Sequence, residues 1–194
     1  MSNGTLARVS ARTAAEVCGR FEIGDEARAL LRPDHSPHQY LMLLSEKQLF
    51  TPAIMFLAHA LPKPEAVWWA YLCAKEVIGL KPSAEANTAL QAAERWVTNP
   101  NDITRRAAMP AAQAAGLSTA AGSAALAAFV SGGSLAPANI PPVPPSENMT
   151  GQVAASAVLL AAVTETAKAI ERMRSFLTRG IEIANGAHRW TERR

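Results

Sequence analysis

The feature that most constrains this chain is a long stretch almost without charge. Between Arg106 and Glu165 the one charged residue is Glu147, and the other positions are mostly Ala, Gly, Ser, Pro and aliphatic residues. A helix with one face in water normally carries charge on that face, whereas a helix that is apolar on all sides is normally buried. Helices in this stretch therefore lie inside the fold or form a surface that a partner covers. The sequence leaves both alternatives open.

The composition of the chain favours closely packed helices. The 194 residues are enough for one domain with a sizeable core, and 49% of them are hydrophobic although only 6% are aromatic. Many of the hydrophobic residues are alanine, which is the best helix former and is small enough to let helices approach closely. Alternating runs of β-branched residues, which indicate strands, are absent from the sequence. We therefore predict an all-α, single-domain bundle of eight or nine helices.

Proline and capping residues divide the first two thirds of the chain into short helices. Ser36-Pro37 fits an N-cap followed by the first helical position, and Gln39 completes a capping box. Thr51-Pro52 repeats the cap-and-proline pair. Because the connections are short, we expect antiparallel helix pairs. The predicted helices cover about 10–21, 25–32, 37–47, 51–61, 64–79, 83–98, 101–115 and 118–130, with Pro110 ending or kinking the seventh.

A proline-rich connection precedes the last predicted helix. Residues 135–149 contain the run Pro141-Pro142-Val143-Pro144-Pro145, which favours an extended polyproline conformation. A long C-terminal helix follows over about 151–186, with a buried first half and an amphipathic second half. We assign residues 1–186 to the helical domain and expect the basic tail at 187–194 to be disordered.

Two features are candidates for a protein-interaction surface. The proline run can either dock on an aromatic groove of a partner or form a strap packed across the helices, and we favour the strap. Adjacent tryptophans on a helix point about 100° apart, so both cannot share one small core pocket unless the helix is central. We expect at least one of them in the core, and one can reach a surface groove and anchor an interface. The candidate interaction residues are Trp68, Trp69, Ile140, Pro141, Pro142, Val143, Pro144 and Pro145.

The sequence contains no catalytic, metal-binding or cofactor motif. It lacks a nucleophile elbow, a phosphate-binding loop, a dinucleotide glycine fingerprint and a zincin motif. His35 and His38 lie close together but have no evident third ligand, so we predict no metal site and no cofactor. His59 lies near a predicted helix end. A pair formed by a histidine and a carboxylate can still assemble in space, which keeps a small hydrolase as an alternative.

Charge and cysteine content favour a cytoplasmic protein that does not bind nucleic acid. The net charge is only +3, and the excess lies in the arginines of the last helix and tail, where a solvated helix end explains it. Cys18 and Cys73 are far apart, which is typical of reduced thiols. The first twelve residues lack the apolar region of a secretion signal, and breaks in the uncharged stretch argue against a transmembrane segment.

Two stretches resemble a known family. The motif L-P-x-x-E-A-x-W-W at residues 61–69, combined with a later G-G-S-x-A-P and P-P-x-P-P segment, is similar to an uncharacterised bacterial family of Ala/Pro-rich all-helical proteins. The resemblance covers about residues 22–186. Some members are encoded near type VI secretion genes, so the resemblance implies an accessory role, such as an adaptor or chaperone for a secreted effector or spike. It carries over no catalytic residue.

From these observations we expect a non-enzymatic protein-interaction function. The partner would be a secretion component, an effector or a second copy of the chain, and it would bury an apolar, charge-poor surface. The alternative is a small hydrolase or immunity-type protein with a pocket assembled in space. Its sign would be a deep cleft that holds His59 or His35 within hydrogen-bond distance of a carboxylate.

Overall fold

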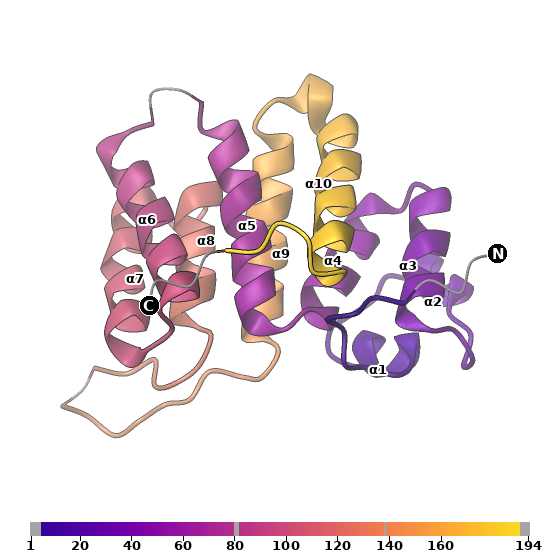
Figure 1. Ribbon diagram of the computed structural model, residues 1–194, viewed down its shortest axis with the longest axis horizontal. Helices are drawn as coiled ribbons and strands as arrows, with labels where there is room; N and C mark the ends of the chain where they lie inside the picture. Colours follow the sequence, from indigo (N-terminus) through magenta and orange to yellow (C-terminus); the bar gives the residue numbers. More distant parts are fainter. Residues whose placement is uncertain (1–4, 80–81, 138, 191–194) are drawn as a thin grey trace.

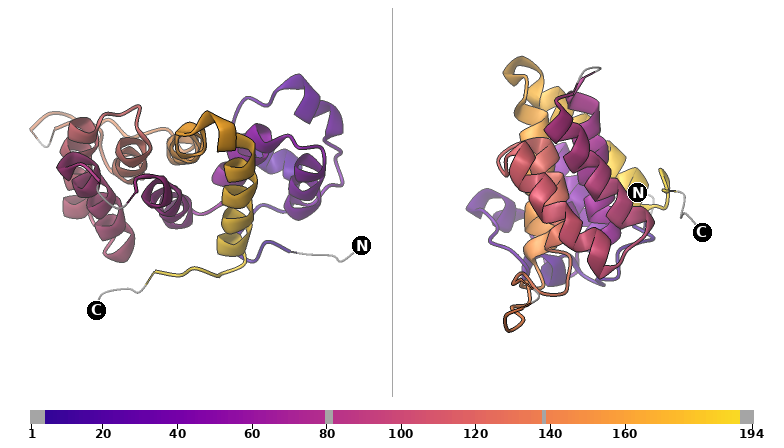
Figure 2. Two further views of the ribbon diagram at one scale, coloured as in Figure 1. Left: turned by 90° about the horizontal axis from the view of Figure 1, so that it is seen from above. Right: turned by 90° about the vertical axis from the view of Figure 1, so that its left-hand side faces the viewer.

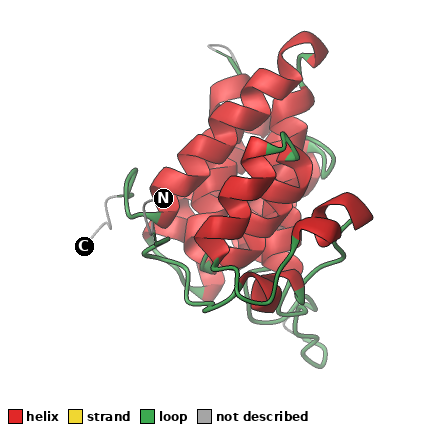
Figure 3. Cartoon of the chain, turned by 90° about the vertical axis from the view of Figure 1, so that its right-hand side faces the viewer, coloured by secondary structure: helices red, strands yellow, loops and turns green. Residues whose placement is uncertain are grey.

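The computed structural model describes residues 5–79, 82–137 and 139–190, and in these residues loops connect helices, without a strand (Figure 3). The prediction of an all-α fold is confirmed. Ten α-helices and one 3-10 turn follow one another: α1 (Ala14–Cys18), α2 (Asp25–Leu30), α3 (Pro37–Glu46), α4 (Phe50–Ala60), α5 (Lys63–Val77), α6 (Ala84–Thr98), α7 (Asp102–Ala115), α8 (Ala120–Phe129), α9 (Met149–Val163), η1 (Thr166–Lys168) and α10 (Ala169–Ala184).

The two helices that lie wholly within the uncharged stretch, α8 and α9, are in the interior of this arrangement. Helix α8 packs against α5, α6, α7 and α9, and α9 packs against α4, α5, α8 and α10 (Figure 1). Because each is surrounded by four neighbours, little of its surface is left to face water. The uncharged stretch is therefore explained for its helical parts by burial within the chain. For α8 and α9 this burial favours the first of the two alternatives that the sequence left open.

Alanine and glycine bring the helices of this half close together. The buried face of α8 consists almost entirely of alanine, and Gly122 lies directly against the turn that precedes the helix. A Cβ atom at Gly122 would lie only 2.0 Å from the carbonyl oxygen of Gly116. Gly116 itself has a φ of 86°, a left-handed conformation that glycine adopts without strain and that ends α7.

The N-terminal end of the molecule is built from larger side chains. The capping box that the sequence predicts at the start of α3 is present, with Ser36 accepting from the Gln39 backbone and Gln39 accepting in return. Behind it, Tyr40 is fully buried, and its hydroxyl donates to the carbonyl of Ala27 at 2.7 Å. The Tyr40 ring meets the edge of Phe56 from α4. Aromatic packing thus joins α2, α3 and α4.

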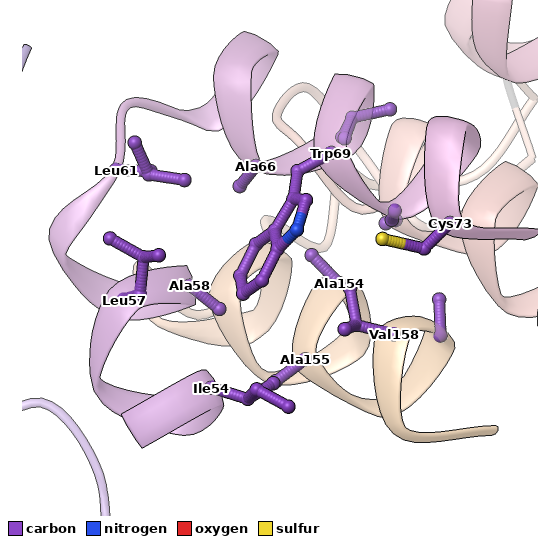
Figure 4. Packing of buried hydrophobic residues seen from close by; sticks show 14 of the residues in the cluster. Ile54, Leu57, Ala58, Leu61, Ala66, Trp69, Cys73, Ala154, Ala155 and Val158 are labelled. Carbon is purple, nitrogen blue, oxygen red and sulfur yellow. The ribbon is translucent and has the colours of Figure 1, made fainter. Parts of the chain in front are cut away.

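Trp69 forms the centre of the core between the two ends. Its ring is fully buried among Leu57, Leu61, Ala154 and Val158 (Figure 4), and its indole N–H donates to the carbonyl of Phe176 on α10 at 2.8 Å. Tryptophan is buried at low cost only where its N–H finds an acceptor, and Phe176 provides one.

The last helix is not continuous, which corrects the prediction of one helix over 151–186. Helices α9 and α10 are separated by Thr164 to Lys168 and meet at an angle of 109°. Seen from above, α10 lies lengthwise while α8 and α9 are viewed nearly end-on (Figure 2). The polar residues of the break bond locally: Arg172 donates to the hydroxyl of Thr164 and pairs with Glu165. Helix α9, before the break, is apolar on nearly all sides, whereas α10, after it, is apolar on one side only.

Smaller differences concern prolines. Pro110 does not end α7, which continues to Ala115. Helix α4 begins at Phe50 rather than after Thr51, so Pro52 occupies the third helical position, where a missing N–H is still tolerated. In the described residues, each helix is too short or too polar to cross a membrane alone.

Candidate functional site

The segment that joins α8 to α9 is anchored at its start by a buried arginine. We call residues 131–148 the Pro-rich loop; residue 138 is outside the described part. Arg105 on α7 is only 4% exposed, and its guanidinium donates to the carbonyls of Phe129 at 2.8 Å and Ser134 at 3.1 Å. Its remaining donors reach Asp102 on the same helix at 2.6 and 2.9 Å. A buried guanidinium needs such partners, so Arg105 fixes the start of the loop.

Two neighbours complete this attachment. Arg106 bonds Asp102 and also donates to the carbonyl of Ala136 at 3.0 Å. The hydrogen bonds from Arg105, and then from Arg106, hold the pKa of Asp102 below its usual value. Gly133 has a φ of 61°, and a Cβ atom there would lie 2.8 Å from the Arg105 guanidinium. Glycine at this position therefore lets the loop turn directly over the buried cation.

The loop also closes on itself. The N–H of Leu135 donates to the carbonyl of Val143 at 2.8 Å, and the hydroxyl of Ser134 accepts from the N–H groups of Ala136 and Val143 at 3.1 and 3.0 Å. At the other side, the ammonium of Lys63 on α5 donates to the carbonyl of Ser131 at 2.9 Å. The loop thus has a defined base with satisfied backbone groups.

The outer part of the loop projects away from the helices, which corrects our preference for a packed strap (Figure 1). Ile140 and Val143 are 50% and 53% exposed. The neighbouring prolines Pro141, Pro142 and Pro144 are also exposed, and Pro145 is half-buried. Backbone hydrogen bonds to Arg105, Arg106 and Ser134 hold the loop, so its apolar side chains are not needed for attachment. They remain available on the surface.

The two tryptophans have separate environments. Trp69 belongs to the core, whereas Trp68 is half-buried at the surface of α5, where its ring stacks on Tyr71 with the centroids 4.8 Å apart. Its indole N–H donates to the carbonyl of His188, and Trp190 meets the ring edge-on. The first part of the basic tail, residues 187–190, therefore lies over α5; residues 191–194 are outside the described part. Trp68 is covered partly by the chain itself.

The histidines do not form a hydrolytic pair in the interior. Among the described residues, the histidine–carboxylate pair is His188 with Glu182 at 2.6 Å, and both side chains are about half exposed. His59 is buried and lines a cavity, but its Nδ1 lies 2.8 Å from the carbonyl of Met55 rather than beside a carboxylate. His35 accepts from the N–H of Arg32 at the chain surface. The described part of the chain holds no group of three or more candidate metal ligands.

The cysteines are buried in separate places. Burial raises the pKa of the Cys18 thiol to about 11 and raises that of Cys73 further. Both are free thiols. Such thiols are protonated near neutral pH and are poor nucleophiles, so they offer no reactive site.

Sequence reasoning missed the role of Arg105. In the sequence it appears only as one of two adjacent arginines in the middle of the chain. Its acceptors are backbone carbonyls 24 and 29 residues away, and any residue type can supply a carbonyl. The available signal was indirect: Asp102 stands three and four residues before the arginines, and this spacing can hold both guanidinium groups on one helix face.

Comparison with known proteins gives a family match. A family model described as "Family of unknown function (DUF6931)" matches residues 40–184, which include α4 to α10 and the whole Pro-rich loop. No curated protein and no solved structure matches the chain.

Proposed function

The chain belongs to the DUF6931 family of unknown function, and we propose from its geometry that it is a non-enzymatic interaction protein that binds a partner through the Pro-rich loop. The observation that carries this proposal is the exposure of Ile140 and Val143 on a loop whose base is firmly attached. Side chains of this kind are normally buried, and each contributes about 1.5–3 kcal/mol when it leaves water completely.

The loop is suited to binding because little of its freedom remains to be lost. Proline fixes φ near −65° and removes a backbone donor, so the run from Pro141 to Pro145 has few accessible conformations. The hydrogen bonds of Leu135 and Ser134 restrict the two ends further. A segment ordered in advance binds with a smaller entropy cost than a flexible one.

The chemistry of the loop indicates the kind of partner. Ile140, Pro141, Pro142 and Val143 offer apolar surface without charge, and proline-rich segments dock in grooves lined by aromatic side chains. We therefore propose a protein partner with an aromatic-lined groove. Ile103 on the first turn of α7, beside Asp102, is also exposed.

The biological setting of the proposal comes from the resemblance to the Ala/Pro-rich bacterial family. Because some of its members are encoded near type VI secretion genes, we propose that the partner is a secretion component or an effector and that binding takes place in the bacterial cytoplasm. An accessory protein that guides an effector needs an exposed, conformationally defined contact, and the Pro-rich loop supplies one.

The test is affinity purification of the tagged chain from its native host, with identification of co-purifying proteins by mass spectrometry. The wild-type chain is compared with Ile140→Asp/Val143→Asp, which places two charges on the exposed apolar surface. We expect a stoichiometric partner with the wild-type chain and its loss with the double variant, because burying an unpaired carboxylate is strongly unfavourable.

The matched control is Val163→Asp/Ile170→Asp. These side chains are 47% and 58% exposed, about as much as those of the loop. Val163 is the last residue of α9 and Ile170 lies on the first turn of α10, whereas the loop enters the other end of α9. This variant should retain the partner. A monomer that captures nothing, or a partner that is lost equally with both double variants, contradicts the proposal.

The hydrolase alternative receives less support from the geometry. This alternative requires a cleft that holds His59 or His35 beside a carboxylate. His59 lines a cavity, but its Nδ1 contacts a backbone carbonyl instead of a carboxylate. The carbonyl of Met55 occupies the position at Nδ1 where a carboxylate would orient a catalytic histidine.

A further inference from the structure

A cavity lies where the first turns of α5 and α9 come together near the end of α4. It has a volume of about 230 Å³ and is lined in part by Arg20, His59, Lys63, Glu147 and Gly151. A single water needs only about 10–15 Å³ of such volume, so the cavity has room for a small molecule. None of these residues takes part in the exposed surface of Ile140 and Val143.

His59, which lines this cavity, has an unsatisfied polar atom. The side chain is 5% exposed, and its Nε2 has no hydrogen-bond partner among the described residues. Buried polar atoms are nearly always paired, so an unpaired one indicates a missing partner. The opposite edge of the ring is hydrogen-bonded to the carbonyl of Met55, and Cδ2, one of the two ring carbons bonded to Nε2, lies 3.0 Å from the place of a Cβ atom at Gly151. The free edge of the ring therefore faces the start of α9.

The chemistry of this nitrogen follows from its neighbours. A carbonyl accepts hydrogen bonds and does not donate them, so the contact with Met55 places the proton of neutral His59 on Nδ1. Burial, followed by the charge of Arg20, lowers the pKa of His59 and favours the neutral ring, although the Met55 contact opposes this. Nε2 then presents a lone pair, and the missing partner has to donate a hydrogen bond.

The rest of the cavity is suited to an anion. Arg20 and Lys63 line it against one carboxylate, Glu147, so the side-chain charge is positive. Both cations already donate to backbone carbonyls, but a guanidinium and an ammonium each keep further donors. The amino-terminal ends of α5 and α9 add the positive ends of two helix dipoles.

Helix α9 also starts with free donors. Asn148 provides no side-chain cap, and within the described chain the backbone N–H groups of Thr150 and Gly151 have no acceptor. Gly151 has no side chain to cover them, and α9 approaches α4 so closely that a Cβ atom there would lie 3.0 Å from the carbonyl oxygen of Ala58. Free N–H groups at a helix start bind phosphate and related anions.

We propose that this cavity binds a hydroxyl-bearing phosphate, with its anionic oxygens toward Arg20, Lys63 and the start of α9 and its hydroxyl donating to Nε2 of His59. The hydroxyl has two sources: the acidic O–H of free phosphate, or a carbon hydroxyl of a small polyol phosphate. The cavity volume accommodates either ligand. Neither the family match nor the loop-binding function assigns this site.

The experiment titrates the full chain with three probes at neutral pH and follows the amide signals of Thr150 and Gly151 by NMR. The probes are inorganic phosphate, glycerol phosphate and sulfate. Sulfate matches phosphate in size and charge but carries no hydroxyl near neutral pH. We expect saturable shifts, with at least one phosphate probe binding about tenfold or more tightly than sulfate. Tighter binding of inorganic phosphate assigns the free ion, and tighter binding of glycerol phosphate assigns a polyol phosphate.

Variants locate the binding within the cavity. Arg20→Gln should weaken phosphate binding about tenfold or more, whereas Arg32→Gln, which removes an exposed arginine outside the cavity, should leave it unchanged. Because Arg20 also bonds the carbonyl of His59 at 2.7 Å, circular dichroism has to show that the variant is folded. The comparison of probes on the wild-type chain does not depend on any variant.

Three results would overturn the proposal. The first is the absence of saturable shifts with millimolar phosphate, which would leave the cavity to water. The second is equal affinity for sulfate and both phosphates, which would remove the role of His59. The third is a shift pattern outside the first turns of α5 and α9. None of these bears on the Ile140 and Val143 surface, so the two proposals fail separately.

Discussion

The two ends of the molecule are buried equally well by opposite means. At the end formed by α3 and α4, large side chains such as Tyr40, Leu44 and Phe56 fill the interior. At the end formed by α6, α7 and α8, most buried residues are alanine, and Gly122 lets α8 approach the end of α7 closely. At the first end, large side chains fill the space between the helices. At the second end, small residues leave so little space that a larger side chain would not fit. The two ends should therefore tolerate different substitutions.

The largest effect is expected from removing volume at the aromatic end. Phe56→Ala deletes a fully buried ring that meets Tyr40 edge-on and leaves a cavity in its place. We expect a loss of about 3–5 kcal/mol in the free energy of unfolding, measured by urea denaturation. A loss below about 1 kcal/mol would show that this end can collapse around the gap, and the contrast between the ends would be weaker than the structure indicates.

Adding the smallest volume should damage the alanine end. Gly122→Ala places a Cβ atom 2.0 Å from the carbonyl oxygen of Gly116, and neither backbone can move without shifting α7 or α8. We expect a loss of about 1–3 kcal/mol in the same measurement. Gly132→Ala is the matched control, because nothing lies within 4 Å of its Cβ position. Equal stability of the two variants would contradict the close-packed description.

A third prediction concerns the one buried arginine of the alanine end. Arg105→Met leaves the carbonyls of Phe129 and Ser134 without their donor, at a cost of about 1–3 kcal/mol. Amide hydrogen exchange should accelerate in residues 131–137 and 139–148, the described parts of the Pro-rich loop. Arg106→Met, at a more exposed pair, should cost less than about 1 kcal/mol. Unchanged exchange in the Arg105 variant would show that the loop is held by its own hydrogen bonds.

The smallest effect is expected at the junction of the ends, where His59 of α4 faces α9. Its pKa is lowered from 6.5 by burial, so the unfolded chain takes up a proton at a higher pH than the folded chain does. Stability should therefore fall as the pH drops below about 6.5 and level off once the pH is below the folded-state pKa. Arg20, Lys63 and Glu147 line the same cavity, so comparison with a variant has to isolate the histidine.

The variant is His59→Asn, whose urea midpoint should depend less on pH than that of the wild-type chain. His38→Asn, at the surface of α3, controls for the loss of one histidine. If the wild-type chain and His59→Asn lose stability in parallel on acidification, His59 is not the group responsible.

The sequence predicted what depends on neighbours along the chain. The all-helical fold and the capping box of Ser36 and Gln39 follow from periodicity and from contacts within one turn, and both are confirmed. The sequence also showed that α8 and α9 would avoid water, but it could not say what covers them. What covers α8 and α9 depends on which four helices pack around each of them. These contacts join residues far apart in the sequence, so no local sequence pattern predicts them.

The sequence was least informative about the Pro-rich loop. Apolar Ile140 and Val143 led us to expect packing against the helices, because apolar side chains are normally buried. The structure instead attaches the loop through carbonyl groups, which every residue has and which no composition reveals. The end of α9 at Val163 was predictable in principle, because the all-round apolar pattern stops there and polar residues follow.

The position of Arg105 ties recognition to folding. The guanidinium is held partly by α7 and partly by the loop, so the loop cannot unravel without leaving a buried cation short of acceptors. A protein that binds the ordered loop therefore binds the folded chain in preference to the unfolded chain. By mass action such a ligand shifts the folding equilibrium, adding about 2.7 kcal/mol when its free concentration is 100 times its dissociation constant. Binding would then depend on whether the whole chain is folded as well as on the sequence of the loop.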